Sequence, residues 1–256
     1  MSQPAALQLF ALPGLPMVQP GDDLASLLGD ALARAQPPQD GDVLVIAQKI
    51  VSKAEGRIVD LATVTPSPRA VALGAEIDKD PRLVEIILGE STRVVRSRPN
   101  LMIMQHRLGF VMANAGVDQS NIAPQDGVER ALLLPRDPDA SAEELRAKLS
   151  ARFGIKLAVI INDSFGRAWR RGTCGVAIGA AGLPSLVDLR GTPDLFDRTL
   201  HVTVVGHADE IAAAASLLMG QSREGQPAVL VRGLRWDAPD CPASELARPE
   251  SEDLFR

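Results

Sequence analysis

The sequence contains few of the residues that build disulfide frameworks and transition-metal centres. It has only two cysteines, and Cys174 and Cys241 lack metal-ligand spacing and are too few for a disulfide framework, although one bridge stays open. The three histidines, His106, His201 and His207, also lack ligand-like spacing, which favours structural or surface roles. The simplest prediction is a cytoplasmic protein in a reducing environment.

Long apolar runs and a basic excess are also missing. No stretch of about 18 apolar residues occurs, so we expect no membrane span. The N-terminal segment has no basic region, and Pro13 and Pro16 interrupt its apolar residues, which predicts a folded strand and turn rather than a signal peptide. The net charge of -5 gives no global positive field for nucleic acid or an anionic membrane. Anionic small molecules remain possible ligands.

The 256 residues are 46% hydrophobic and 23% charged, which is typical of a globular chain with a sizeable core. Strands and helices are mixed without strict alternation, so we predict a mixed α/β fold in which segments distant in sequence pair. We expect one domain over residues 1–240, or two interlocked subdomains there, and a loosely held tail over 241–256. Helices are expected over 22–35, from 67–68, from 80–81, over 141–154 and over 208–219; strands are expected over 43–47, 92–96, 101–105, 109–113, 157–162, 201–205 and 228–232.

Polar residues gather directly after buried strands at four places. After the strand 43–47 come Gln48-Lys49 and Ser52-Lys53, where lysines can hold phosphate oxygens as point charges. Two solvated turn lysines are the alternative. The second place is the segment 114–121, NAGVDQSN, in which Asp118 and Asn121 offer hard oxygen donors. An Asx-rich turn without a ligand explains that composition equally well.

The third place carries the strongest pattern, because a carboxylate and a hydroxyl, Asp163 and Ser164, follow the strand 157–162. Such a pair suits a divalent cation. Arg167, Arg170 and Arg171 then place positive charge on a glycine-containing loop. We therefore favour binding of phosphate or carboxylate over a solvated arginine loop without a ligand.

The fourth place is the segment 219–227, MGQSREGQP, which predicts either a lid over a ligand or a long surface turn. Neither a Walker P-loop nor a dinucleotide-binding G-x-G-x-x-G after a strand occurs, so the common nucleotide-binding motifs are excluded.

Five segments in one order and spacing resemble a known family, the coenzyme F-420-0:L-glutamate ligases. They are LPGLPMV, GDVLVIAQKIVSKAEGRIV, NAGVDQSN, INDSFGRAWRRGTCGVAIG and ADEIAAAASLLMGQSREGQPAVLVRG, and the resemblance covers residues 8 to 236. It implies a mixed α/β fold in an intertwined homodimer. Some relatives carry an additional C-terminal flavin-reductase domain, which we do not expect here.

The resemblance implies a ligase that uses GTP to activate a carboxylate of coenzyme F-420-0 as an acyl phosphate. The amino group of L-glutamate then attacks, and later cycles add γ-linked glutamates. The implied cofactors are Mn²⁺ or Mg²⁺, with K⁺ as a further candidate. Catalysis would consist mainly of positioning and charge neutralisation.

The resemblance also implies roles for individual residues. Asp118 and Asp163 would hold one metal ion, Ser164 and Gln221 would contribute to a second, and Arg167 would assist catalysis together with the two carboxylates. The residues that would bind the nucleotide are Leu15, Pro16, Met17, Val18, Gln48, Lys49, Lys53, Asn121, Met219, Gly220, Gln221, Ser222, Arg223, Glu224, Gly225 and Gln226.

Two positions depart from the family pattern. Ser164 stands where threonine is expected, which keeps the hydroxyl, and Gln221 stands where glutamate is usual, which weakens a second metal site unless Glu224 substitutes. Two other functions therefore stay open. One is a ligase of this fold with another acceptor or amino acid, and the other is a non-catalytic nucleotide-binding protein.

Overall fold

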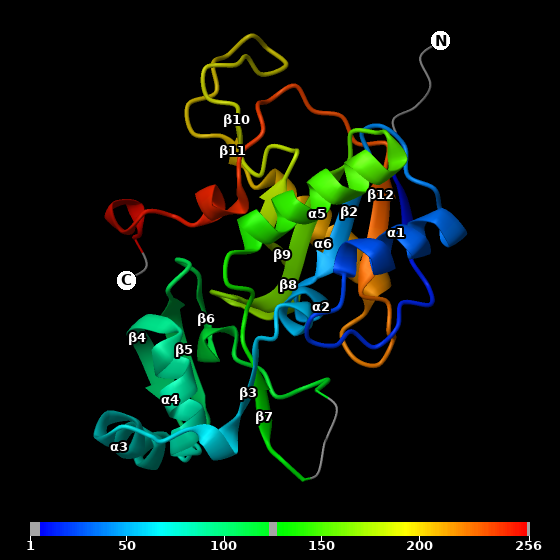
Figure 1. Ribbon diagram of the computed structural model, residues 1–256. Helices are drawn as coiled ribbons and strands as arrows, with labels where there is room; N and C mark the ends of the chain where they lie inside the picture. The colour runs from blue at the N-terminus through cyan, green and yellow to red at the C-terminus, as the bar shows by residue number, and fades with distance from the viewer. Residues whose placement is uncertain (1–5, 123–126, 255–256) are drawn as a thin grey trace.

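A five-stranded sheet forms the centre of the computed structural model, which describes residues 6–122 and 127–254 (Figure 1). Its strand order is β1-β12-β2-β8-β9, in which only the pair β2 and β8 is parallel. The strands are β1 (Gln8–Ala11), β12 (Ala228–Arg232), β2 (Val43–Ala47), β8 (Ala158–Arg167) and β9 (Arg170–Ala181). The prediction of a mixed α/β fold with non-local pairing is confirmed.

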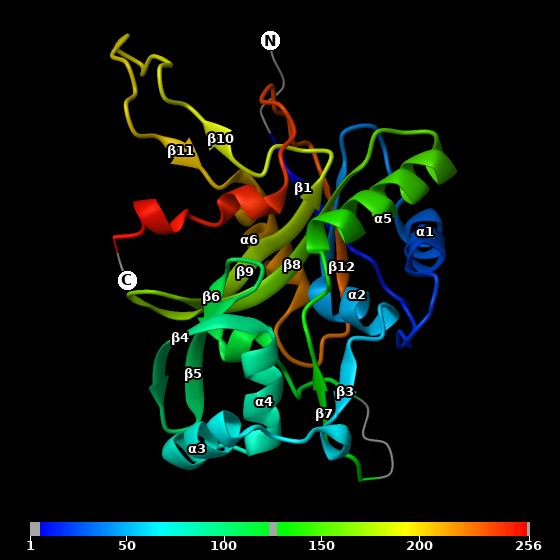
Figure 2. The same cartoon turned by 60° about the vertical axis from the view of Figure 1, so that its left-hand side comes forward.

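Helices cover both faces of this sheet, because its central strands are apolar on both sides. Along β2, Leu44 and Ile46 join the core beneath α1 (Leu24–Ala35) and α5 (Pro138–Phe153). The alternate residues Val43 and Val45 pack in the second core, beneath α6 (His207–Met219). Figures 1 and 2 show α1 and α5 on one side of the sheet and α6 on the other.

A smaller unit lies below the central sheet in Figure 2 and has a core of its own. It packs two helices against a three-stranded antiparallel sheet of order β4-β5-β6. An antiparallel pair, β3 and β7, links it to the central unit. The elements are α3 (Pro68–Ile77), α4 (Pro81–Gly89), β4 (Ser91–Arg98), β5 (Leu101–His106), β6 (Val111–Ala113), β3 (Ile58–Asp60) and β7 (Arg130–Leu132).

The remaining elements are short. An arm built on the pair β10 (Val187–Asp188) and β11 (Val204–Val205) projects away from the central sheet (Figure 2). The others are α2 (Gln48–Ala54) and the 3₁₀ turns η1 (Leu61–Thr63), η2 (Asn114–Gly116), η3 (Ala243–Leu246) and η4 (Glu250–Glu252). Ala243 in η3 is buried, and its backbone N–H donates to Asp139 over 2.8 Å. Within the described residues, no helix is both long and apolar enough to cross a membrane.

Several predicted boundaries were wrong. The expected strand 157–162 continues to Arg167 and turns back through β9, so the expected arginine loop is the end of a β-hairpin. The helix expected from Ser141 begins at Pro138, because Asp137 caps it by accepting from the N–H of Ala140 over 3.0 Å. The strand expected over 201–205 is reduced to Val204–Val205.

Candidate functional site

A cleft of about 540 Å³ opens beside the ends of the parallel strands β2 and β8. Ligands commonly bind at the carboxyl ends of parallel strands. Four segments of the chain line the cleft, and a fifth contributes Asn121 and Ile122. These segments are Leu15–Val18, the start of α2 with Ala47–Ile50 and Lys53, the β8 residues Asn162–Ser164, and the loop Met219–Pro227.

The cleft therefore gathers all the residues expected to bind the nucleotide. Leu15 to Val18, Gln48, Lys49, Lys53, Asn121 and residues 219–226 all lie on its wall, as do Asp163 and Ser164. The expected residues Asp118 and Arg167 are not among the residues that line it. Ile50 and Pro227 also line it and were not predicted, because apolar residues carry no chemical pattern that marks a ligand.

The two lysines lie one turn apart on α2, which begins directly after β2. Lys53 is buried, and its Nζ donates to the backbone oxygen of Asn121 over 2.8 Å. Burial lowers the pKa of Lys53, and the neighbouring charge of Lys49 lowers it further. The alternative of two solvated turn lysines is thus wrong for Lys53. A bound anion would relieve the repulsion between the two ammonium groups.

Lys49 connects the cleft to Asp118. Its Nζ lies 2.5 Å from Oδ2 of Asp118 and donates to Oγ of Ser120 over 2.8 Å. Ser120 in turn donates to Asp118 from its N–H and its hydroxyl, each over 2.8 Å. Although burial opposes ionisation of Asp118, these donors and the Lys49 charge hold the pKa of the carboxyl below its usual value. Asp118 is therefore an ionised carboxylate paired with Lys49, which lines the cleft.

The backbone before Asp118 has an unusual conformation. Asn114, Ala115 and Gly116 have φ values of 51°, 52° and 68°, three left-handed residues in succession. Glycine suits such a conformation, whereas the buried Ala115 adopts it at a steric cost. Gly116 also leaves no room for a side chain, because an added Cβ would lie 2.8 Å from Leu134. Tertiary packing thus fixes the path of the chain into Asp118.

Asp163 and Ser164 lie within β8 and not after its end, in contrast to the prediction. Asp163 faces the cleft but has protein around most of its carboxyl, and this burial raises its pKa, with the Asp118 charge adding to the rise. The hydroxyl of Ser164 donates to Oε1 of Gln221 over 2.7 Å. Two mutually repelling carboxylates, one of them desolvated, form an environment that a cation would stabilise.

The oxygen donors near the cleft fit a hard divalent cation. Asp118, Asp163, Ser164 and Gln221 supply carboxylate, hydroxyl and amide oxygens, which are the ligands that Mg²⁺ and Mn²⁺ prefer. No group of three or more His, Cys, Asp or Glu side chains with metal-binding geometry occurs among the described residues. Water and ligand oxygens would thus have to complete the coordination, as is common for Mg²⁺.

Arg167 was expected to assist catalysis and Glu224 to replace a metal ligand, and the structure gives both side chains other surroundings. Arg167 lies exposed at the end of the β8–β9 hairpin, as do Arg170 and Arg171, and none of the three is among the residues that line the cleft. Glu224 accepts from the N–H of Ser222 over 2.7 Å and so closes its own loop. The Ser164 hydroxyl is paired with Gln221 and not with Glu224.

Comparison with known proteins agrees with the motif resemblance. The sequence model of the family described as F420-0:Gamma-glutamyl ligase matches residues 14–233. The coenzyme F420:L-glutamate ligase of Methanothermobacter thermautotrophicus is 47% identical over 253 residues, covering 98% of this chain and 99% of the relative. The protein of the same name from Methanopyrus kandleri is 47% identical over 244 residues, covering 93% of each chain. That from Archaeoglobus fulgidus is 43% identical over 251 residues, covering 98% of this chain and 96% of the relative.

Proposed function

The chain belongs to the F420-0:gamma-glutamyl ligase family, and from this premise we propose that it joins L-glutamate to coenzyme F420-0 at the expense of GTP. The family membership supports a ligase of coenzyme F420 biosynthesis. The observation that carries the finer proposal is the cleft that sets Lys49 and Lys53 beside Asp163 and the Lys49-paired Asp118. Lysines suit phosphate oxygens and carboxylates suit the counter-cation of a nucleotide, so this combination of charges supports the proposal.

The proposed reaction has two steps. A carboxylate oxygen of the acceptor first attacks the γ-phosphorus of GTP, which forms an acyl phosphate and releases GDP. The amino nitrogen of L-glutamate then attacks the acyl carbon, inorganic phosphate leaves, and the amine loses a proton to give the amide. Neither step requires a covalent bond to the protein, so the chain contributes positioning and charge.

The residues of the cleft divide this work. Lys49 and Lys53 would pair with phosphate oxygens, and the loop 219–226 would close over the nucleotide. Asp118, Asp163 and Ser164 would hold Mn²⁺ or Mg²⁺, with Gln221 as a neutral ligand toward a second ion. When bound, the metal would neutralise charge on the transferring phosphoryl group. We also propose K⁺ as a further ion that the protein binds.

We also propose that the chain acts as a homodimer. The arm around β10 and β11 exposes apolar side chains, with Leu195, Phe196 and Val202 at 98%, 79% and 86% exposure. Exposed apolar groups gathered on one projection favour contact with a second protein surface. Light scattering coupled to size-exclusion chromatography tests this, and a mass of 27.2 kDa for the species in solution would contradict it.

Mass spectrometry of the reaction products tests the proposed function. The purified protein is incubated with coenzyme F420-0, L-glutamate, GTP and Mn²⁺, with each component omitted in turn. A product heavier by one or more glutamyl units, dependent on GTP and metal, is expected. Addition of another amino acid, or to another acceptor only, would favour a ligase of different specificity. GTP binding without any addition would favour a non-catalytic nucleotide-binding protein.

A further inference from the structure

The Lys49–Asp118 pair joins two parts of the molecule. Lys49 belongs to α2, which follows directly from the central strand β2. Asp118 follows β6 and η2 of the smaller unit, whose core includes Val117. The spacing of these two charges therefore depends on how the smaller unit is held against the central sheet.

A continuous path of backbone hydrogen bonds runs from Asp118 back to α2. Asp118 and Leu132 exchange two such bonds, of 3.0 and 2.8 Å. The next residue, Leu133, donates to the carbonyl of Arg57 over 3.0 Å, and the N–H of Arg57 donates to Ser52 in α2 over 2.9 Å. Arg57 thus links α2, which carries Lys49, to the segment Leu132–Leu133, whose backbone pairs with Asp118.

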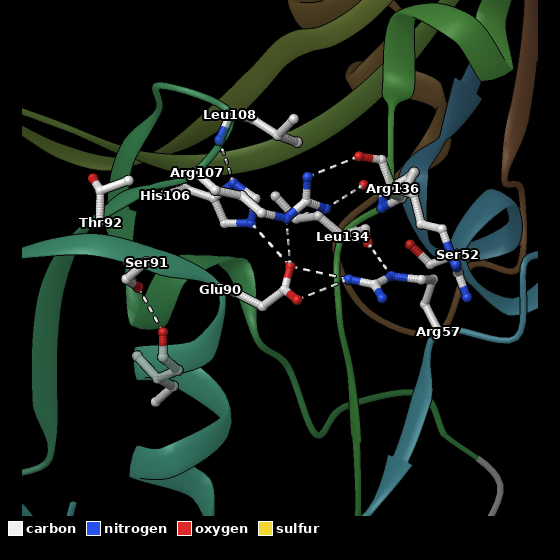
Figure 3. Close-up of polar contacts among 12 residues, drawn as sticks. Ser52, Arg57, Glu90, Ser91, Thr92, His106, Arg107, Leu108, Leu134 and Arg136 are labelled. Carbon is white, nitrogen blue, oxygen red and sulfur yellow. Dashed lines mark hydrogen bonds and ion pairs between the residues drawn. The ribbon is translucent and has the colours of Figure 1, made fainter.

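The side chain of Arg57 strengthens the same link. Its Nε donates to the carbonyl of Leu134 over 2.9 Å, and its Nη2 donates to both carboxylate oxygens of Glu90 over 3.0 Å (Figure 3). Both side chains are only 14% exposed, so solvent screens the pair weakly. Glu90 directly follows α4, so this contact reaches from the central unit to the body of the smaller one.

The smaller unit also holds Glu90 from its other side. Nε of Arg107 lies 3.2 Å from Oε2 of Glu90, and Nε2 of the buried His106 lies 3.5 Å from the same oxygen (Figure 3). Arg107 further donates from Nη1 to the carbonyl of Arg136 over 2.9 Å. These four residues, Arg57, Glu90, His106 and Arg107, are called the Glu90 cluster below.

We propose that Glu90 and Arg57 are positioning residues that fix the Lys49–Asp118 pair, an inference that rests on the proposed function of the cleft. Neither residue is among those that line the cleft, so both act through others. Glu90 orients the Arg57 guanidinium, and Arg57 aligns α2 with the strand that holds Asp118. The metal-binding carboxylate and the phosphate-binding lysine are then held at a fixed spacing before any ligand arrives.

Two conservative variants separate this role from simple packing. Glu90→Gln keeps the size of the side chain but leaves the mostly buried Arg57 without a counter-charge. Arg57→Lys keeps the charge but loses the planar fork that reaches Leu134 and both oxygens of Glu90 together. Glu143→Gln is the matched control, because it breaks the exposed Glu143–Arg146 pair on α5, away from the cleft.

The experiment combines a measurement without ligands and one with them. Hydrogen–deuterium exchange of the ligand-free protein is followed over residues 114–119 and 130–134, with residues 158–162 of β8 as the internal reference. Steady-state glutamylation then gives KM for GTP, the half-saturating Mn²⁺ concentration and kcat per folded enzyme. We expect both variants to exchange faster in the first two segments only. We also expect about a tenfold rise in KM or in the metal requirement, while Glu143→Gln matches the wild type.

Either of two results would overturn the proposal. One is wild-type exchange in both segments together with unchanged KM and metal requirement. The other is faster exchange spread equally to residues 158–162, which indicates general destabilisation. If the wild type shows no GTP-dependent addition at all, the proposed function fails, and the exchange pattern alone decides the positioning role.

Discussion

Lys49 Nζ lies 2.5 Å from Oδ2 of Asp118, so the cation that we propose binds phosphate and the carboxylate that we propose binds the metal ion neutralise each other in this structure. When a nucleotide and its metal ion bind, Lys49 would pair with a phosphate group and Asp118 with the metal ion, and the ion pair between the two side chains would be lost. The pairing of Lys49 with Asp118 limits the cost of keeping these two groups partly buried.

Asp163→Asn is expected to lower turnover by about a hundredfold or more, because it removes the charge that we propose holds the cation. The fold should survive with an unchanged or higher unfolding midpoint, since burial raises the pKa of Asp163 and the neutral amide avoids the cost of burying charge. Turnover number and thermal unfolding midpoint measure the two effects. Asp209→Asn makes the same change at a partly buried acid whose pKa burial also raises and which is not among the residues that line the cleft, and it should leave turnover intact.

Lys53→Met is expected to weaken GTP binding about tenfold or more, which corresponds to the loss of one charge-assisted hydrogen bond. Methionine keeps the apolar part of the buried side chain, so stability should change little. Titration with a fluorescent GTP analogue gives the affinity. Lys148→Met, at an exposed lysine paired with Glu144, serves as the control. Equal affinities for wild type and Lys53→Met would remove this lysine from the site.

Gln221→Glu tests whether the amide oxygen that accepts from Ser164 faces a metal ion. A carboxylate is the stronger ligand, so the half-saturating Mn²⁺ concentration should fall. Gln226→Glu adds the same charge elsewhere in the loop and controls for general attraction of cations. Equal shifts in the two variants would show that Gln221 has no special contact with the ion.

Gly116→Ala is expected to destabilise the protein by about 1–3 kcal/mol and to impair the site. The added Cβ would lie 2.8 Å from Leu134, at a residue whose φ is +68°. Gly89→Ala, with no atom within 4 Å of the new Cβ, should be neutral or slightly stabilising. Urea unfolding measures both. A Gly116 variant as stable as the wild type would refute a tightly packed turn before Asp118.

The ionisation of Glu90 predicts a stability difference that depends on pH. Burial disfavours the charged form, but the close contact with His106, the Arg57 hydrogen bonds and the two arginine charges together lower the pKa of Glu90 to about 2. A depressed acid pKa stabilises the fold above the unfolded value of about 4.3, and this contribution disappears as the pH falls toward 2.

The measurement is the free energy of unfolding of wild type and Glu90→Gln at several pH values. The advantage of the wild type should be largest near neutrality and should shrink once the pH drops below about 4.3. A difference between the two proteins that stays constant across this range would contradict the ionised Glu90 cluster.

The sequence predicted the buried strands best. The ranges 43–47 and 228–232 match β2 and β12, because each is a continuous apolar run between turn residues. The sequence did not predict strand β9, because three glycines interrupt its apolar pattern. This strand forms by pairing with β8 in the hairpin, which a local pattern does not indicate. Helix α2 was also missed, since it is a single short element whose polar residues resemble a turn.

The residues of the candidate site could be proposed one by one from the sequence, but their arrangement could not. Motif resemblance identified Lys49 and Asp118 separately, yet their ion pair depends on β3 and β7 joining two units. Glu90 and Arg57 carry no motif, and their relation exists only after the smaller unit folds against the central sheet. Local patterns cannot specify a contact that is made by tertiary packing.

The most direct test of the account follows oxygen through one reaction. Coenzyme F420-0 carrying ¹⁸O in its carboxylate is incubated with the protein, L-glutamate, GTP and Mn²⁺, and both products are analysed by mass spectrometry. We predict a glutamyl product together with inorganic phosphate that contains one ¹⁸O atom, because an acyl phosphate transfers one carboxylate oxygen to phosphorus. A glutamyl product formed with unlabelled phosphate would contradict activation of the acceptor carboxylate, and the absence of a glutamyl product would contradict the ligase itself.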